Sequence, residues 1–144
     1  MKTTLISLAI AAMTCAGAAV AGGHASGDAA AGETVFKKCK SCHMIQSEDG
    51  SVNLKGGKVG PNLYGVASRT AGSVEGFRYG KSIIALGETG LAWDEAEFVA
   101  YVADPSKYLQ EKLGDKKARS KMTYKLRGEQ DAKDVYAYLV SLAE

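Results

Sequence analysis

The sequence predicts a small, single-domain all-α protein with about four or five helices joined by long loops. Apolar residues recur at helical spacing in separate segments, and no strand–helix–strand pattern is present. Residues that cap or interrupt helices stand at the ends of these segments. The chain of 144 residues has room for one core and little for a second domain.

Residues 1–21 are predicted to be a cleaved signal peptide. Lys2 gives a positive start, residues 5–20 form an apolar run, and the run ends in the small triplet Ala19-Val20-Ala21. The run is shorter than the roughly 20 residues of a membrane-spanning helix. We therefore expect cleavage after Ala21, no stable membrane insertion and a periplasmic location. Cys15 would leave with the leader.

The mature chain, residues 22–144, is expected to form one domain. Loss of Lys2 lowers the count of basic residues from 18 to 17, against 16 acidic ones. This near balance says little about partners, and the paired lysines are too sparse for a nucleic-acid site. Because exported proteins meet oxidising conditions, the two remaining cysteines would ordinarily be expected to form a disulfide. The residues around them indicate a different role.

The first predicted helix begins after Asp28, a residue type that caps helices, and ends at Cys39. Its apolar stripe consists of Gly32, Val35, Phe36 and Cys39. A long irregular stretch from about residue 46 to residue 70 follows, rich in glycine. A loop of this length is unusual in so small a domain unless something else completes the core.

Three further helices are predicted in the second half of the chain. Asp94, with Glu97 three residues later, forms a capping-box-like pair at the start of one of them. Pro105 ends that helix or opens a new first turn, and Gly114 ends the next, short helix. The last helix runs from about residue 129 to residue 143 with apolar residues at helical spacing.

The segment Cys39-Lys40-Ser41-Cys42-His43 is a CxxCH motif, which is typical of covalent haem attachment. Thiols at i and i+3 lie on one side of a helical turn, so both can add to the vinyl groups of one haem. His43 can then present its imidazole to the iron. Two alternatives are a redox-active disulfide and a zinc half-site, although zinc would need more ligands than the mature chain offers.

Met122 is the candidate for the second axial ligand, by elimination. The methionines of the leader are lost, Met44 directly follows His43 and cannot reach the other face, and His24 lies in a Gly- and Ala-rich tail. Lys121 is a competing ligand if the methionine detaches. The alternative is that Met122 only packs, which would leave an open iron and make the protein a haem enzyme or gas sensor.

These features together resemble the class I c-type cytochromes, most closely the bacterial cytochrome c2 group related to mitochondrial cytochrome c. The resemblance covers nearly the whole mature chain. It rests on the CxxCH motif and, in order, on Gly60-Pro61-Asn62-Leu63-Tyr64-Gly65, Trp93, Asp104-Pro105-Ser106-Lys107-Tyr108 and Ser120-Lys121-Met122-Thr123. It implies the class I cytochrome c fold, with helices and loops wrapped around one covalently attached haem c.

The resemblance also implies a haem environment. The carbonyl of Pro61 would accept a hydrogen bond from the proximal histidine. Arg69 matches a basic residue near a haem propionate, and Tyr79 and Trp93 match propionate donors. Tyr101 matches an aromatic residue whose hydroxyl approaches the methionine sulfur. Gly32 would allow close packing of the terminal helices.

By resemblance the protein is an electron carrier rather than an enzyme, and we expect a monomer. Its partners would be a cytochrome bc1 complex as donor and a photosynthetic reaction centre or cytochrome c oxidase as acceptor. Docking would use lysines around the haem edge, namely Lys37, Lys38, Lys40, Lys58, Lys107, Lys121 and Lys125. Two departures from the mitochondrial pattern are the longer segment 109–121 and Ile83 in place of an asparagine.

Overall fold

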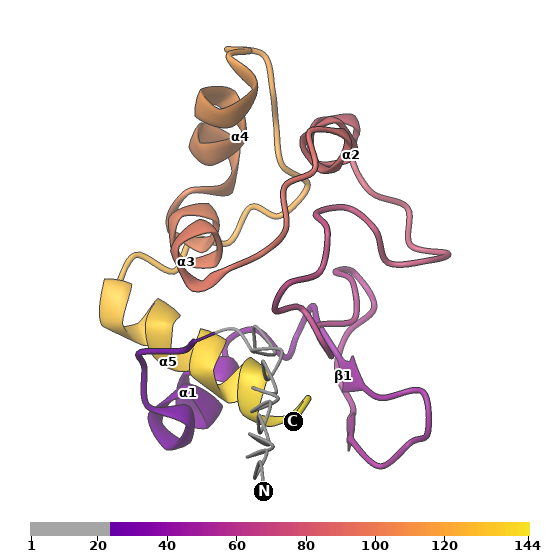
Figure 1. Cartoon of the computed structure of the whole chain (residues 1–144), viewed down its shortest axis with the longest axis vertical. Helices are drawn as coiled ribbons and strands as arrows, with labels where there is room; N and C mark the ends of the chain where they lie inside the picture. Colours follow the sequence, from indigo (N-terminus) through magenta and orange to yellow (C-terminus); the bar gives the residue numbers. More distant parts are fainter. Residues whose placement is uncertain (1–23) are drawn as a thin grey trace, which may run out of the picture.

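The computed structural model describes residues 24–144, and within this range it has five helices and one two-stranded hairpin (Figure 1). The elements are α1 (Ala29–Phe36), β1 (Ile45–Gln46), β2 (Asn53–Leu54), α2 (Lys81–Glu88), α3 (Glu95–Ala103), α4 (Pro105–Leu113) and α5 (Glu129–Ser141). The predicted signal peptide, residues 1–21, lies outside the described residues. None of the helices in 24–144 is long and apolar enough to cross a membrane.

Aspartates begin three of the helices. The carboxylate of Asp28 accepts hydrogen bonds from the amides of Ala30 and Ala31 at 2.8 and 3.0 Å and so starts α1 as predicted. Asp94 starts α3 in the same way by accepting from the amide of Glu97 at 2.8 Å. Asp104 caps α4, whose first residue is Pro105. Each cap satisfies amides that have no partner inside the helix.

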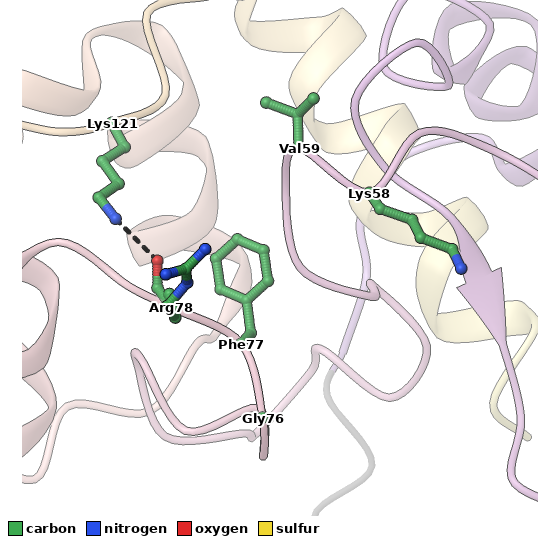
Figure 2. Close-up of a pocket in the computed structure, with 6 residues that line it drawn as sticks. All are labelled: Lys58, Val59, Gly76, Phe77, Arg78 and Lys121. Atoms are coloured by element: carbon green, nitrogen blue, oxygen red, sulfur yellow. Dashed lines mark hydrogen bonds between the residues drawn. The ribbon is translucent and has the colours of Figure 1, made fainter.

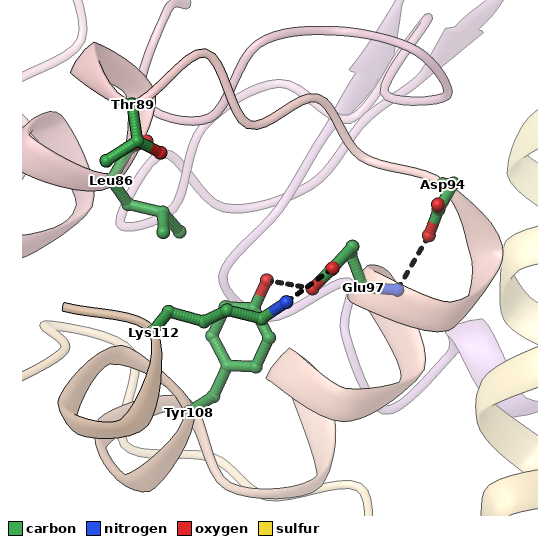
Figure 3. A network of polar contacts seen from close by, with 6 residues as sticks. All are labelled: Leu86, Thr89, Asp94, Glu97, Tyr108 and Lys112. Atoms are coloured by element: carbon green, nitrogen blue, oxygen red, sulfur yellow. Dashed lines mark hydrogen bonds and ion pairs between the residues drawn. The ribbon is translucent and has the colours of Figure 1, made fainter. Parts of the chain in front are cut away.

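The capping box predicted at α3 is only half made. The side chain of Glu97 turns away from Asp94 and accepts hydrogen bonds from Tyr108 and from Lys112, the latter at 2.5 Å (Figure 3). Both donors belong to α4, and the Lys112 ammonium also lies 5.5 Å from the centre of the Tyr108 ring. This network joins α3 to α4.

The structure adds two elements that the sequence did not predict. Helix α2 begins after Gly80 without a side-chain cap, so it lacks the usual start signal. The hairpin pairs Ile45 with Leu54, and its strands are only two residues long, too short for an alternation pattern. The rest of the stretch from residue 46 to residue 70 is irregular, as predicted.

The terminal helices pack directly against each other (Figure 1). A Cβ atom on Gly32 would lie 1.9 Å from the backbone oxygen of Asp134, so only glycine allows this approach. The rings of Phe36 and Tyr138 pack against each other at a tilt of 51°, with their centres 5.7 Å apart. Helix α3 contacts both α5 and α4, and α4 also contacts α2. The predicted contact between the terminal helices is confirmed.

Candidate functional site

The CxxCH segment forms tight turns that continue from the end of α1. The amide of Cys39 bonds the carbonyl of Phe36 at 2.8 Å, and the amides of Cys42 and His43 both bond the carbonyl of Cys39 at 3.0 Å. The two cysteines and the histidine therefore lie on consecutive turns at one site. Cys39 and Cys42 form no disulfide with each other. Burial, together with the neighbouring Cys42 and against the effect of Lys38, raises the pKa of Cys39 to about 11.

The ring of His43 is fixed from one side by the loop at Gly60 and Pro61. Its Nδ1 lies 2.8 Å from the carbonyl oxygen of Pro61, to which a protonated Nδ1 donates. A Cβ atom on Gly60 would lie 2.3 Å from Cε1 of the ring, so the glycine lets the backbone pack flat against the imidazole. Burial lowers the pKa of His43, opposed by the Pro61 carbonyl, which favours a neutral ring with a free lone pair on Nε2.

Backbone hydrogen bonds fasten this loop to the CxxCH segment. The amide of Gly57 bonds the carbonyl of Lys40 at 2.9 Å, and the amide of Gly60 bonds the carbonyl of Cys42 at 2.8 Å. A Cβ atom on Gly57 would lie 2.0 Å from the carbonyl oxygen of Ser41. The glycine-rich loop and the CxxCH segment therefore lie too close together for a side chain between them, which explains the glycines at these positions.

Met122 lies half-buried against the core in a segment that hydroxyl groups hold in place. The Oγ of Ser120 accepts from the amide of Met122 at 3.0 Å and lies 2.9 Å from the hydroxyl of Tyr101. The amide of Ser120 in turn bonds the Oγ of Ser106 at 3.1 Å. Both serines stand in segments that carry the family resemblance, but the sequence alone assigns no role to either.

The hydroxyl of Tyr101 bonds Ser120, which also accepts from the Met122 amide. Tyr101 therefore acts on the methionine segment through this serine. The approach of this hydroxyl to the sulfur of Met122 stays a prediction. The Tyr101 ring lies 5.1 Å from the ring of Trp93, which is buried in the core.

Arg69 binds backbone carbonyls of the glycine-rich loop. Its guanidinium donates to the carbonyls of Tyr64 and Asn62 at 2.8 and 3.0 Å, and burial lowers its pKa. Asn62 also bridges to Gln46 through two hydrogen bonds of 3.0 and 2.7 Å. Tyr79 lies close enough to Arg69 for the two to influence each other's pKa, and burial raises the pKa of Tyr79. A propionate role for Arg69, Tyr79 or Trp93 stays a prediction.

The longer segment 109–121 completes α4 and then packs back on the protein. Ala118 is buried, and its carbonyl accepts a hydrogen bond from Gln110 at 3.1 Å. The amide of Arg119 bonds the Oγ of Ser82 in α2 at 3.1 Å. The segment therefore links α4 and α2 and fixes the chain just before Met122.

A cavity of about 450 Å³ opens beside these segments (Figure 2). Its lining residues are Lys58, Val59, Gly76, Phe77, Arg78 and Lys121. Lys121 spans from the methionine segment to the opposite loop, where its ammonium donates to the carbonyl of Arg78 at 2.8 Å. The lining is cationic at three positions, with Phe77 and the exposed Val59 as its apolar part.

These residues fit a covalently attached haem. Two cysteines that form no disulfide stand next to an imidazole whose orientation is fixed, and a thioether comes from a separate segment whose backbone is hydrogen-bonded by Ser120. Within residues 24–144 no cluster of three or more His, Cys, Asp or Glu side chains offers a metal site of another kind. Two cysteines, an imidazole and a thioether are the groups by which the resemblance implies that a c-type haem is held.

Comparison with known proteins agrees with this chemistry. The cytochrome c family model matches residues 29–143. The chain belongs to the cytochrome c family. It is 54% identical over 118 residues to a cytochrome c2 of Rhodovulum adriaticum, a match that covers 81% of this chain and 94% of that protein. It is also 48% identical to a cytochrome c2 of Rhodobacter capsulatus over the full length of both chains.

Solved structures of cytochromes show the same fold. Cytochrome c2 from Rhodobacter capsulatus superposes with a TM-score of 0.77 at 52% identity, covering 82% of this chain and all of that one. Ferric cytochrome c-550 from Paracoccus versutus gives 0.77 at 50% identity, covering 83% and 100%. The predicted class I cytochrome c fold is confirmed.

Membership in the cytochrome c family establishes the cofactor and the general role. The protein carries one covalently attached haem c and is an electron carrier rather than an enzyme. The predictions of family, cofactor and general role are confirmed. The roles of individual residues, including the axial ligands, stay predictions that the geometry above supports.

Proposed function

We propose that this cytochrome c is exported to the periplasm after cleavage behind Ala21 and shuttles single electrons there. Cys39 and Cys42 attach the haem, and His43 and Met122 hold its iron. The haem supplies a centre that takes up one electron and returns it. A cytochrome bc1 complex is the donor, and a photosynthetic reaction centre or cytochrome c oxidase is the acceptor.

The observation that carries this proposal is that separate parts of the chain hold the His43 ring and the backbone of Met122. His43 is held by the Pro61 carbonyl and by the flat contact with Gly60, while Met122 is held through Ser120. A donor held rigidly in both redox states keeps structural change small when an electron moves. A thioether ligand also favours the ferrous iron and therefore raises the reduction potential.

The proposed docking face lies around the cavity. Val59 is 79% exposed there, beside Lys58, and Lys121 and Arg78 stand opposite. An apolar centre within a cationic rim suits a brief encounter with an acidic partner, because charge speeds association and the small apolar contact releases easily.

Not every lysine of the predicted ring is equally available for docking. Lys38 pairs with Asp131 at 3.6 Å, Lys107 with Glu111 at 3.7 Å and Lys125 with Asp104 at 2.6 Å. Four lysines of the ring make no salt bridge within residues 24–144, namely Lys37, Lys40, Lys58 and Lys121. Of these four, Lys58 and Lys121 line the cavity. We therefore place the centre of the docking face at these two lysines.

The visible spectrum of the exported protein tests the ligand set. We expect low-spin spectra in both redox states, a ferric far-red band from methionine-to-iron coordination, and no change of the ferrous spectrum with carbon monoxide. Met122→Leu keeps the volume of the side chain and should become high-spin and bind the gas. A wild-type protein that binds carbon monoxide readily would instead support the haem enzyme or gas sensor.

The partner surface has its own test. Lys58→Glu should slow electron transfer with a detergent-solubilised bc1 complex or reaction centre, and should weaken the fall of the rate with added salt. Lys107→Glu is the matched control, because Lys107 already pairs with Glu111, and we expect a smaller effect. Equal effects of the two substitutions would contradict the placement of the docking face.

A further inference from the structure

Met122 stands in the middle of a segment without regular secondary structure, residues 119–125, which is the methionine segment. The last buried residue before it is Ala118 and the first after it is Leu126, with 2% and 6% of their surface exposed. The residues between these two are partly or fully exposed. The position of Met122 therefore depends on a few bonds between the methionine segment and the helices around it.

The chain that follows Met122 is anchored at the junction of α3 and α4. The amide of Leu126 bonds the carbonyl of Val102 at 2.8 Å, and the Leu126 side chain is buried. The ammonium of Lys125 also donates to the carboxylate of Asp104 at 2.6 Å, but both side chains are more than one-third exposed or close to it, at 39% and 34%. An exposed ion pair adds little stability. Leu126 is therefore the anchor at this end.

The chain that precedes Met122 depends on the hydroxyl groups of two serines. The Oγ of Ser106, in the first turn of α4, accepts from the amide of Ser120 at 3.1 Å. The Oγ of Ser120 accepts from the amide of Met122 at 3.0 Å and lies 2.9 Å from the hydroxyl of Tyr101. Ser106 thus fixes the backbone of the residue that in turn holds Met122.

Two further bonds reach the neighbours of Ser120 in the sequence, and both are exposed to water. The amide of Arg119 bonds the Oγ of Ser82 in α2 at 3.1 Å, and the ammonium of Lys121 donates to the carbonyl of Arg78 at 2.8 Å (Figure 2). Water replaces an exposed bond at small cost, whereas an amide that loses its partner away from water costs more. The bond from Ser120 to α4 is partly buried, so its loss should weigh more.

We propose that Ser106 is a positioning residue for the axial ligand and sets how easily Met122 leaves the iron. Without the Ser106 hydroxyl, the amide of Ser120 loses its partner in α4, and the methionine segment opens from this end while Leu126 stays fixed. Such an opening is local and does not require unfolding of the protein. The inference rests on the proposed ligation by Met122 and adds the residue that resists its release.

The first test measures how readily a small ligand replaces Met122 in the ferric holoprotein. Imidazole is the probe, because it reaches the iron only when the methionine has left. Ser106→Ala removes the hydroxyl and should raise the affinity for imidazole about fivefold, the factor that the loss of one hydrogen bond typically gives. Ser106→Thr keeps a hydroxyl and should restore the wild-type affinity. Lys125→Ala, the matched control, removes only the exposed ion pair and should change the affinity less than about twofold.

Amide hydrogen exchange gives a second readout, which does not involve the iron. In Ser106→Ala the amides of Ser120 and Met122 should exchange faster, while the amide of Leu126 keeps its rate. Unchanged imidazole affinity in Ser106→Ala, an equal effect of Lys125→Ala, or faster exchange that extends to Leu126 would each overturn the proposal.

Failure of the proposed ligation would look different. A wild-type ferric protein without the far-red methionine band would refute ligation by Met122 itself. The exchange rates of the Ser120 and Met122 amides would still decide whether Ser106 holds the methionine segment.

Discussion

The α1–α5 pair and the loops of the haem site are held together in different ways. The helix pair relies on buried side chains and one close backbone contact at Gly32. The loops rely on hydrogen bonds between backbone groups and side chains: Arg69 and Asn62 donate to carbonyls, and Ser120 accepts from an amide. The helix pair therefore depends mainly on side-chain packing, whereas the loops, which share the same hydrophobic core, depend also on polar contacts.

Gly32 and Gly60 illustrate this difference between the helix pair and the loops. Gly32 faces the backbone of the opposite helix, and Gly60 faces the ring of His43. A methyl group added at Gly32 should damage the fold as a whole, whereas one added at Gly60 should damage the site first.

Gly32→Ala should cause the largest loss of stability, about 3 kcal/mol, because the backbone of Asp134 cannot move aside without separating the terminal helices. Denaturant unfolding of the holoprotein measures it. Gly128→Ala is the control, since its Cβ would meet only the side chain of Asp131 at 3.4 Å. A similar stability of the two variants would contradict the role given to the close helix contact.

Gly60→Ala should cost less, about 2 kcal/mol, but should change the haem spectrum, because the added methyl group pushes the His43 ring away from Pro61. Visible spectroscopy and the reduction potential measure the change. Gly80→Ala meets only the flexible side chain of Lys121, at 3.4 Å, and should leave the spectrum as it is. An unaltered spectrum of Gly60→Ala would show that the ring is fixed elsewhere.

Glu97→Gln should reduce stability by about 1 kcal/mol at neutral pH, because the network joining α3 to α4 loses its charge. Burial opposes ionisation of Glu97, but hydrogen bonds from Lys112 and Tyr108 outweigh it and lower its pKa from the ordinary 4.5.

The pH dependence of this effect has a definite sign. A depressed pKa stabilises the folded state above about pH 4.5, and the gain disappears as the pH falls through the lower folded value. Unfolding curves of Glu97→Gln and the wild type should therefore converge in acid. A difference in stability that stays constant from neutral pH to pH 3 would contradict this explanation.

Ser68→Gly should give the smallest effect, a gain of about 0.5 kcal/mol. Ser68 has φ of 61°, and glycine relieves the strain of this conformation while its larger freedom in the unfolded chain offsets part of the gain. The amide that bonds the carbonyl of Trp93 at 2.7 Å is kept. Thermal unfolding measures the gain, and Ser68→Ala, which keeps the strain, should show none.

Much of the helical structure was predictable because local signals specify it. Asp28, Asp94, Pro105 and Gly114 each act on their own helix end, so the sequence is sufficient to place them. Helix α2 escaped prediction because Gly80 gives it no side-chain cap. The last helix ends at Ser141, two residues earlier than predicted.

The candidate site was predictable only in part. The CxxCH motif is contiguous, and Met122 followed by elimination, so the main donors could be named. The supports of Met122 come from Ser106, Ser120 and Tyr101, whose hydrogen bonds depend on how distant segments meet. The change of Glu97 from a capping residue to a link with α4 depends on the fold in the same way.

The most direct test of the account is the NMR spectrum of the ferrous protein with ¹³C-labelled methionine methyl groups. The mature chain is expected to hold two methionines, Met44 and Met122. The account predicts that the methyl group of Met122 is strongly shielded by the haem ring, with its signal absent from Met122→Leu, while Met44 resonates in the ordinary range. Two methyl signals in the ordinary range would contradict ligation of the iron by Met122.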